Sequence, residues 1–354
     1  MRFLCLPGAY GSAKNFGVQL GPFAKHMEDR GLATFAFTQG AHEVEPPLGW
    51  ENYFGSRPLY RFIDGTANNS SGDAFEVIRR VRHIPRGLSP EATLRLFKPT
   101  EPVQKYDWKN FRDSLDSLLQ QIDDDPEIDG LIGYSEGAMM AASICAEENR
   151  RWEEMGVPRR IKFAIFFAGT PALVAEKDSS SSSSNNNNNC PNFTTKLADE
   201  HGTSIHIPTF HVFGSNDPLV YSSIALYNTC DPDLAQLYDH GLGHLVPRDA
   251  DNVEQLGDTL SDVITRINKE KTAAAALASK EQQQQQQPSR VQTPVNQFTD
   301  EYDVATNTAS SSSSSSASSA SEAGSMGESD LDSQSSTGAA SEDGVNVKKL
   351  SVMV

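Results

Sequence analysis

The chain has 354 residues and an acidic balance of 30 Lys and Arg against 47 Asp and Glu, a net charge of −17. A general nucleic-acid surface is excluded because it needs a basic patch, and the nearest candidate, RRVRHIPR at 79–86, is better explained as a solvated face or loop. No apolar stretch approaches the roughly 18 residues of a membrane span and no secretory signal is visible, so we expect a cytoplasmic protein without membrane or nucleic-acid partners.

The first half of the chain alternates short apolar runs with helical patterns. The run FLCL at 3–6 predicts a buried strand, followed by a Gly-rich turn and a helical segment at about 13–30. ATFAF at 33–37 predicts a second strand. In 106–122, apolar residues recur at spacings of three and four, which predicts an amphipathic helix. DGLIGY at 129–134 then predicts another buried strand.

The second half continues the alternation. Apolar runs at 162–169, 208–214 and 235–240 predict three more strands. A helix is expected from about 252 to 268, where apolar residues fall on one face. Strands that alternate with helices indicate an α/β fold, a mostly parallel sheet with helices on both faces.

Composition divides the chain into a domain and a tail. From residue 272 to 354 the sequence is rich in Ala, Gln, Ser and acidic residues, which cannot bury enough surface to offset ordering entropy, so we predict disorder. Residues 1–271 are predicted to form a single α/β domain. Within it, the Pro- and Gly-rich region 40–100 is predicted to be a cap-like excursion from the sheet, and the Ser and Asn run at 178–190 a low-complexity surface loop.

The four cysteines are widely separated, with no C-x-x-C pair. We expect them to be reduced and mostly buried in a chain without a secretory signal. They are Cys5, Cys145, Cys190 and Cys230.

The stretch Gly133-Tyr134-Ser135-Glu136-Gly137 has the pattern G-x-S-x-G between a predicted buried strand and a predicted helix. By itself this pattern is common. In a strand–turn–helix context it indicates a nucleophile elbow, in which a sharp turn presents the serine hydroxyl above the sheet. The start of the following helix would direct its positive dipole end toward a developing oxyanion. Ser135 is therefore the candidate nucleophile.

A serine nucleophile needs a base and an orienting carboxylate, which in this architecture follow in the order acid, then histidine. Asp217 lies just after a predicted strand in a Gly/Asn/Pro turn, where it could equally be a turn former or helix cap. His244 follows the last predicted strand in a Gly-rich loop, where the base is expected. His240 and His244 also form H-x-x-x-H, but two intervening glycines argue against a helical metal site. We expect no metal and no cofactor.

The oxyanion hole needs two backbone N–H donors. Glu136, directly after the nucleophile, is expected to supply one, and the loop after the first strand the other. In that loop the donor is either Ala9 or Tyr10, and the sequence does not distinguish them.

Aromatic residues gather in the excursion. They could belong to the core or form the wall of an acyl pocket, and the two interpretations stay open. The residues are Trp50 and the four candidate substrate contacts Tyr53, Phe54, Tyr60 and Phe62.

Four stretches together make residues 1–270 resemble the fungal serine hydrolases of the α/β-hydrolase superfamily. They are LCLPGAYGSA (4–13), GYSEGA (133–138), HVFGSNDPLV (211–220) and GLGHLVPR (241–248). The resemblance implies an α/β-hydrolase fold with Ser135, Asp217 and His244 as catalytic triad. Many members begin L-H-G-x-G, whereas Pro7 stands in place of that histidine here, so the loop after the first strand departs from the family pattern at this position.

Within that family the chain is similar to esterase and thioesterase members of fungal secondary-metabolite pathways. This likeness implies hydrolysis of a small-molecule ester or a carrier-bound acyl thioester, with release of a polyketide or other acyl product and a polyketide synthase carrier domain as a possible partner. A general small-ester carboxylesterase is the alternative enzyme. A non-catalytic ligand-binding protein of hydrolase fold is the alternative of another class, against which the complete Ser, Asp and His set argues.

Overall fold

The computed structural model describes residues 1–50, 53–63, 85, 87–97, 108–175 and 193–285. Three parts of the chain named above lie outside the described residues. They are the predicted loop at 178–190, nearly all of the basic run at 79–86, and the chain from 286 onward. The chain divides into two units, Met1–Ser289 and Arg290–Val354, and the first holds every feature below.

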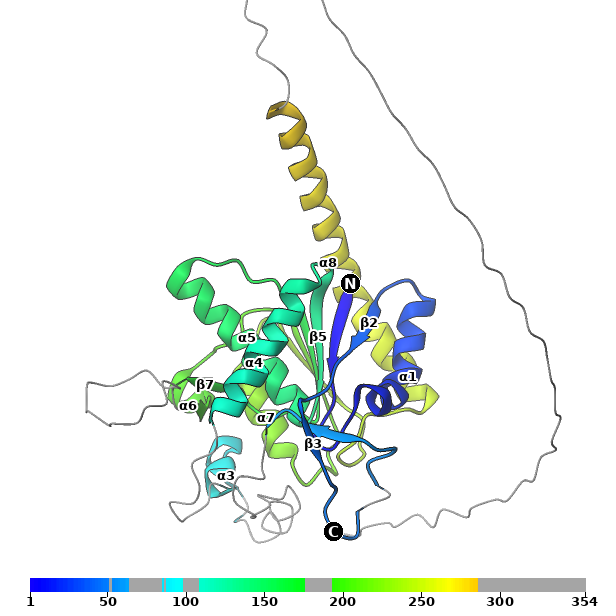
Figure 1. The fold of residues 1–354 in the computed structure, drawn as a ribbon, viewed down its shortest axis with the longest axis vertical. Helices are drawn as coiled ribbons and strands as arrows, with labels where there is room; N and C mark the ends of the chain where they lie inside the picture. The colour runs from blue at the N-terminus through cyan, green and yellow to red at the C-terminus, as the bar shows by residue number, and fades with distance from the viewer. Residues whose placement is uncertain (51–52, 64–84, 86, 98–107, 176–192, 286–354) are drawn as a thin grey trace, which may run out of the picture. The chain divides into compact units, whose positions relative to one another are not determined.

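The first unit is built on a six-stranded parallel sheet (Figure 1). The strand order is β10-β9-β6-β5-β1-β2, and neighbouring strands pair in parallel throughout. The predicted α/β-hydrolase class and all six predicted strands are thereby confirmed. The strands are β1 (Arg2–Leu6), β2 (Thr34–Phe37), β5 (Ile128–Tyr134), β6 (Phe163–Phe167), β9 (Thr209–Phe213) and β10 (Ala235–Asp239).

Helices cover both faces of the sheet (Figure 1). Side chains alternate along a strand, so in β1 Phe3 and Cys5 join one core cluster while Leu4 and Leu6 join the other. The cluster of Phe3 and Cys5 also holds apolar side chains of two helices, and the cluster of Leu4 and Leu6 holds those of another two together with Leu226 of α7 (Val220–Asn228). These pairs are α1 (Ala13–Asp29) with α8 (Ala250–Gln285), and α4 (Trp108–Asp124) with α5 (Glu136–Met155).

The predicted excursion contains a small hairpin and a short helix among its described residues. Strands β3 (His42–Val44) and β4 (Leu59–Arg61) pair antiparallel, and α3 (Pro90–Phe97) follows. The backbone N–H of Tyr60 donates to the carbonyl of Gly11 at 3.1 Å, so the hairpin is joined to the loop after β1. The remaining elements are β7 (Leu173–Ala175), β8 (Phe193–Thr195) and α6 (Ala198–His201).

Helix α8 is longer than the sequence pattern predicted. We expected it to end near residue 268 and disorder to begin at 272, but the helix continues to Gln285. Its buried face ends near Ile267, and residues 271–277 are exposed. The extension is rich in Ala, Lys and Gln, which have high helix propensity and maintain a helix without packing. The predicted start of the tail therefore falls inside a helix.

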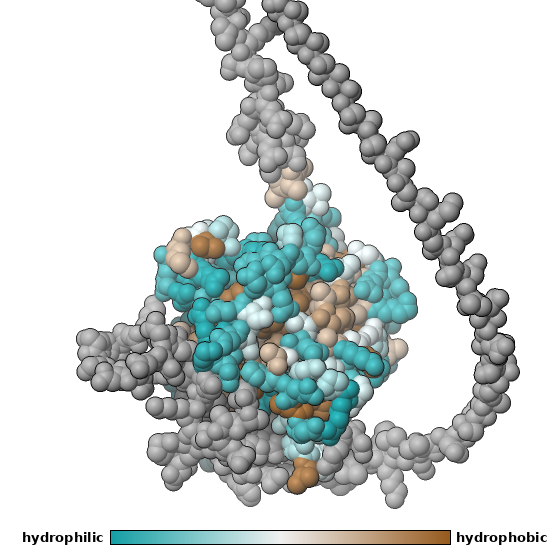
Figure 2. Space-filling model, viewed as in Figure 1, coloured by the Kyte–Doolittle hydropathy of each residue, from teal (hydrophilic) through white to brown (hydrophobic). Residues whose placement is uncertain are grey.

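The surface drawn in Figure 2 is mainly hydrophilic, with apolar residues in small groups. Within the described part of the chain, no helix combines the length and apolarity needed to cross a bilayer. Cys5, Cys145 and Cys230 are free and buried, as expected, and Cys190 lies outside the described residues.

Candidate active site

Ser135 lies at a sharp turn between the end of β5 and the start of α5. Its backbone has φ 53° and ψ −115°, a conformation that is costly for a residue with a side chain. Two neighbouring glycines allow this turn. A Cβ on Gly133 would lie 2.4 Å from the Cα of Ala138, and one on Gly137 would lie 2.2 Å from the carbonyl oxygen of Leu6. The G-x-S-x-G pattern thus reflects backbone contacts with no room for side chains.

The structure brings the three predicted triad residues together. The Nε2 atom of His244 lies 3.0 Å from the Oγ atom of Ser135, and its Nδ1 atom lies 2.8 Å from Oδ2 of Asp217. The Asp217 carboxylate is buried, and its Oδ1 atom accepts a 2.8 Å hydrogen bond from the backbone N–H of Leu219. The turn contact and the contact with the imidazole that the sequence left open are therefore compatible in Asp217, because each uses a different carboxylate oxygen.

The loop that carries Asp217 and the loop that carries His244 are joined by hydrogen bonds. Asn216 donates its backbone N–H to the carbonyl of Leu242 at 3.1 Å and its side-chain amide to Gly241 O at 2.7 Å. Asp239, at the end of β10, accepts from the N–H groups of Ser215 and Gly241, both at 2.8 Å. These contacts fix the distance between the loop of the Asp217 carboxylate and the loop of the His244 imidazole.

His240 supports the loop that carries His244. Its Nδ1 atom accepts a 3.2 Å hydrogen bond from Leu242 N–H, and its Nε2 atom is buried without a partner. Burial lowers the pKa of His240, although the carboxylates of Asp239, Asp217 and Asp249 oppose that shift. No group of three His, Cys, Asp or Glu side chains suited to a metal occurs within the residues that the structure describes.

Tyr134, the variable residue of the elbow, contacts His244, the candidate base. Its hydroxyl donates to the carbonyl oxygen of His244 at 3.0 Å, and the two rings lie 5.4 Å apart. Burial raises the pKa of the Tyr134 phenol, which therefore stays neutral and remains a donor. Only its adjacency to Ser135 could have indicated this role.

The loop after β1 lies beside the candidate nucleophile. A Cβ on Gly8 would lie 3.2 Å from the Cβ of Ser135, and Gly11 N–H donates to Gly8 O at 3.0 Å, which closes a tight turn over residues 8–11. Tyr10 within this turn has a positive φ of 60°. Ala9 and Tyr10 therefore both lie in a turn that adjoins Ser135 through Gly8, and Glu136 begins α5 directly after Ser135.

The four predicted substrate contacts divide into two groups. The ring of Phe54 lies 4.7 Å from the ring of Tyr10, and Tyr53, which is 64% exposed, packs edge-on against Phe54. These two form an aromatic surface beside the loop after β1. Tyr60 is half-buried in β4, whereas Phe62 is buried in the core cluster of α4 and α5 and takes the other role that the sequence left open.

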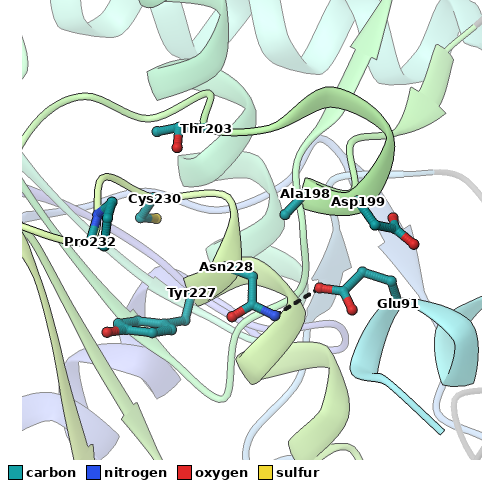
Figure 3. A pocket seen from close by; sticks show the side chains of 8 residues that line it. All are labelled: Glu91, Ala198, Asp199, Thr203, Tyr227, Asn228, Cys230 and Pro232. Carbon is teal, nitrogen blue, oxygen red and sulfur yellow. Dashed lines mark hydrogen bonds between the residues drawn. The ribbon is translucent and has the colours of Figure 1, made fainter.

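A cavity of about 420 Å³ lies elsewhere in the first unit (Figure 3). Its lining includes Glu91 of α3, which accepts a 2.7 Å hydrogen bond from the side chain of Asn228, together with Asp199 and Cys230. No triad residue lines it. The chemistry of the elbow, and not cavity size, therefore locates the candidate active site.

Comparison with known families agrees with the geometry. The sequence model of the family described as Serine hydrolase (FSH1) matches residues 1–256. The chain belongs to this family. As a member of the FSH1 serine hydrolases, it is an enzyme that acts on esters, and the resemblance noted in the sequence is confirmed at the level of the family.

Several relatives are similar over most of the domain. Esterase FPY3 of Fusarium mangiferae is 34% identical over 201 residues, covering 56% of this chain and 85% of that protein. Hydrolase phiM of Talaromyces stipitatus is 26% identical over 252 residues, covering 70% and 82%. Esterase OVCA2 of Homo sapiens is 24% identical over 251 residues, covering 70% and 89%.

Proposed function

We propose that this FSH1 serine hydrolase cleaves its substrate through an acyl-enzyme formed on Ser135, with His244 as general base and Asp217 as orienting carboxylate. The observation that carries the proposal is the position of His244, whose two ring nitrogens lie 3.0 Å from the Ser135 hydroxyl and 2.8 Å from the Asp217 carboxylate. This arrangement of base and orienting carboxylate activates the serine hydroxyl, which by itself is a weak nucleophile at neutral pH.

In the first half-reaction Ser135 Oγ attacks the acyl carbonyl while His244 Nε2 takes the hydroxyl proton. Asp217 keeps the Nδ1 proton on His244 and stabilises the imidazolium that forms. The N–H of Glu136 and the N–H of Ala9 or Tyr10 bind the oxyanion of the tetrahedral intermediate. His244 then returns the proton to the leaving alcohol or thiol. In the second half-reaction His244 deprotonates a water, which hydrolyses the acyl-enzyme.

For the substrate we propose a hydrophobic acyl ester or thioester, including a polyketide or similar acyl chain carried on a synthase carrier domain. The aromatic surface of Tyr53 and Phe54 next to Tyr10 supports an apolar acyl group, because such surfaces bury apolar ligand area. The relatives named esterases support an ester substrate, whereas the carrier-bound thioester follows only from the resemblance of the sequence to thioesterases of fungal secondary-metabolite pathways.

The triad is tested by labelling the full chain with a fluorophosphonate probe. Wild type should be labelled, whereas Ser135→Ala and His244→Ala should not. Matched controls are Ser261→Ala on α8 and His201→Ala on α6, which should label like wild type. Labelling of the Ser135→Ala protein, or none of folded wild type, would contradict the assignment.

The substrate is tested by comparing kcat/KM for one acyl group as a short-alcohol ester, as a free thioester and as a thioester on a carrier domain. A preference of about tenfold or more for the carrier-bound form, equal to about 1.4 kcal/mol, is expected if the carrier is recognised. Equal or better turnover of the short ester would favour the general carboxylesterase instead.

A further inference from the structure

The side chain of Glu136 is held by the β3–β4 hairpin. Its carboxylate is 7% exposed and forms an ion pair with Arg61 of β4, whose Nε and terminal nitrogen both donate to Oε2, at 2.9 and 2.7 Å. The backbone N–H of Phe62 donates to the other carboxylate oxygen at 2.7 Å. Three hydrogen bonds therefore fix the side chain of the residue whose backbone is proposed to bind the oxyanion.

The same arginine contacts the second part of the proposed oxyanion hole. The guanidinium of Arg61 lies over the ring of Tyr10, 5.7 Å from the ring centroid, within the range of cation–π attraction. One residue earlier, Tyr60 N–H donates to Gly11 O in the same loop. The hairpin thus reaches both candidate sources of N–H donors, the loop after β1 and the start of α5.

The backbone that presents Arg61 is itself closely packed. A Cβ on Gly40 would lie 2.0 Å from the carbonyl oxygen of Arg61, and the buried hydroxyl of Ser114 on α4 donates to Phe62 O at 2.6 Å. Contacts on both sides leave little room for Arg61 to shift its position. A rigid support is what an oxyanion hole needs, because small displacements of its donors weaken transition-state binding.

We propose that Arg61 is a positioning residue for the oxyanion hole, which it holds by joining Glu136 to Tyr10 and by neutralising the Glu136 carboxylate. The inference rests on the proposed function. An unpaired carboxylate next to the hole would repel the oxyanion as it forms, and the repulsion would be strong because the group is largely removed from water. Arg61 acts through Glu136 and Tyr10, not on the substrate.

The test compares Arg61→Met, Arg61→Lys, Glu136→Gln and the double variant Arg61→Met/Glu136→Gln. Each rate is divided by the number of active sites, counted from the endpoint of fluorophosphonate labelling, and thermal melting checks folding. Inhibition by an aryl trifluoromethyl ketone, which becomes a tetrahedral oxyanion on the serine, reports the hole directly. Arg95→Met is the matched control, since Arg95 is also an arginine in side-chain ion pairs, with Asp199 and Glu200.

For Arg61→Met we expect kcat per site to fall about 10- to 100-fold, less than the roughly 100- to 1,000-fold loss of a whole donor, with KM changed less than about threefold. The ketone should bind weaker by a similar factor. Arg61→Lys should lose less than Arg61→Met. The double variant should be at least about fivefold more active than Arg61→Met, because it lacks the unpaired charge.

A purely structural role predicts a different pattern. Arg61→Met would then melt at lower temperature with kcat per site and ketone affinity unchanged, as expected of Arg95→Met, and the inference would be wrong. Loss through KM alone would also overturn it, because that outcome indicates substrate contact. If wild type itself neither labels nor hydrolyses esters, the proposed function fails first. An active wild type separates the two failures.

Discussion

The substitution Asp217→Asn tests the orienting carboxylate with almost no change in shape. In the native protein Asp217 Oδ2 faces His244 Nδ1 and Oδ1 accepts from Leu219 N–H, both at 2.8 Å. Asparagine has one oxygen for these two donors. If that oxygen stays on Leu219, the amide NH₂ faces Nδ1 and makes it an acceptor, so the His244 proton moves to Nε2. The imidazole then cannot accept the Ser135 proton.

The productive tautomer requires the amide to flip, which places its NH₂ against Leu219 N–H and leaves a buried donor unpaired. That costs about 1–3 kcal/mol, and loss of the charged acceptor for the imidazolium costs about 1.5–3 kcal/mol more. The sum, about 2.5–6 kcal/mol in activation free energy, corresponds to a decrease in kcat/KM of roughly 10²- to 10⁴-fold. Binding of substrate should change little.

The assay is hydrolysis of a p-nitrophenyl ester, with thermal melting to verify the fold. Asp239→Asn is the matched control on the same pair of loops. One oxygen of Asp239 accepts both of its backbone hydrogen bonds, so an asparagine can keep them and the rate should fall less than about tenfold. A folded Asp217→Asn protein with kcat/KM within tenfold of wild type would refute the reasoning.

Two further predictions concern stability. His211 is buried, and burial lowers its pKa from 6.5 to about 3. Below pH 6.5 the unfolded chain therefore binds a proton at His211 that the folded chain does not bind, so the free energy of unfolding decreases as the pH falls. The free energy of unfolding, measured in urea, should decrease between pH 7 and pH 4.5 by about 2–3 kcal/mol less for His211→Phe than for wild type. An equal decrease in the two proteins would contradict this prediction. At the elbow, Gly137→Ala should destabilise by at least about 1–3 kcal/mol, because its Cβ would overlap Leu6 O. Gly21→Ala in α1, where nothing lies within 4 Å of the new Cβ, should instead stabilise by about 0.5–1 kcal/mol. Melting curves of the two variants that shift in the same direction would be inconsistent with this packing argument.

Elements with a strong local pattern were predictable. Helix α4 was expected from apolar spacing, and β5 from a continuous apolar run next to glycines. The far end of α8 was missed because the prediction relied on burial, whereas Ala, Lys and Gln continue a helix by propensity alone. The positions of Tyr53 and Phe62 could not be separated from sequence, since an aromatic residue suits a core and an exposed wall equally.

The sequence by itself determined the fold class and three triad candidates, because each candidate lies in the turn or loop that follows a strand, and the glycines and the order of the three are typical of the chemistry. The tertiary structure alone decided what surrounds them. The pairing of Arg61 with Glu136 joins residues 75 positions apart, and Tyr134 reaches a carbonyl 110 positions away. Such contacts cannot be predicted from residue spacing, because they depend on how loops that follow separate strands meet in the folded domain.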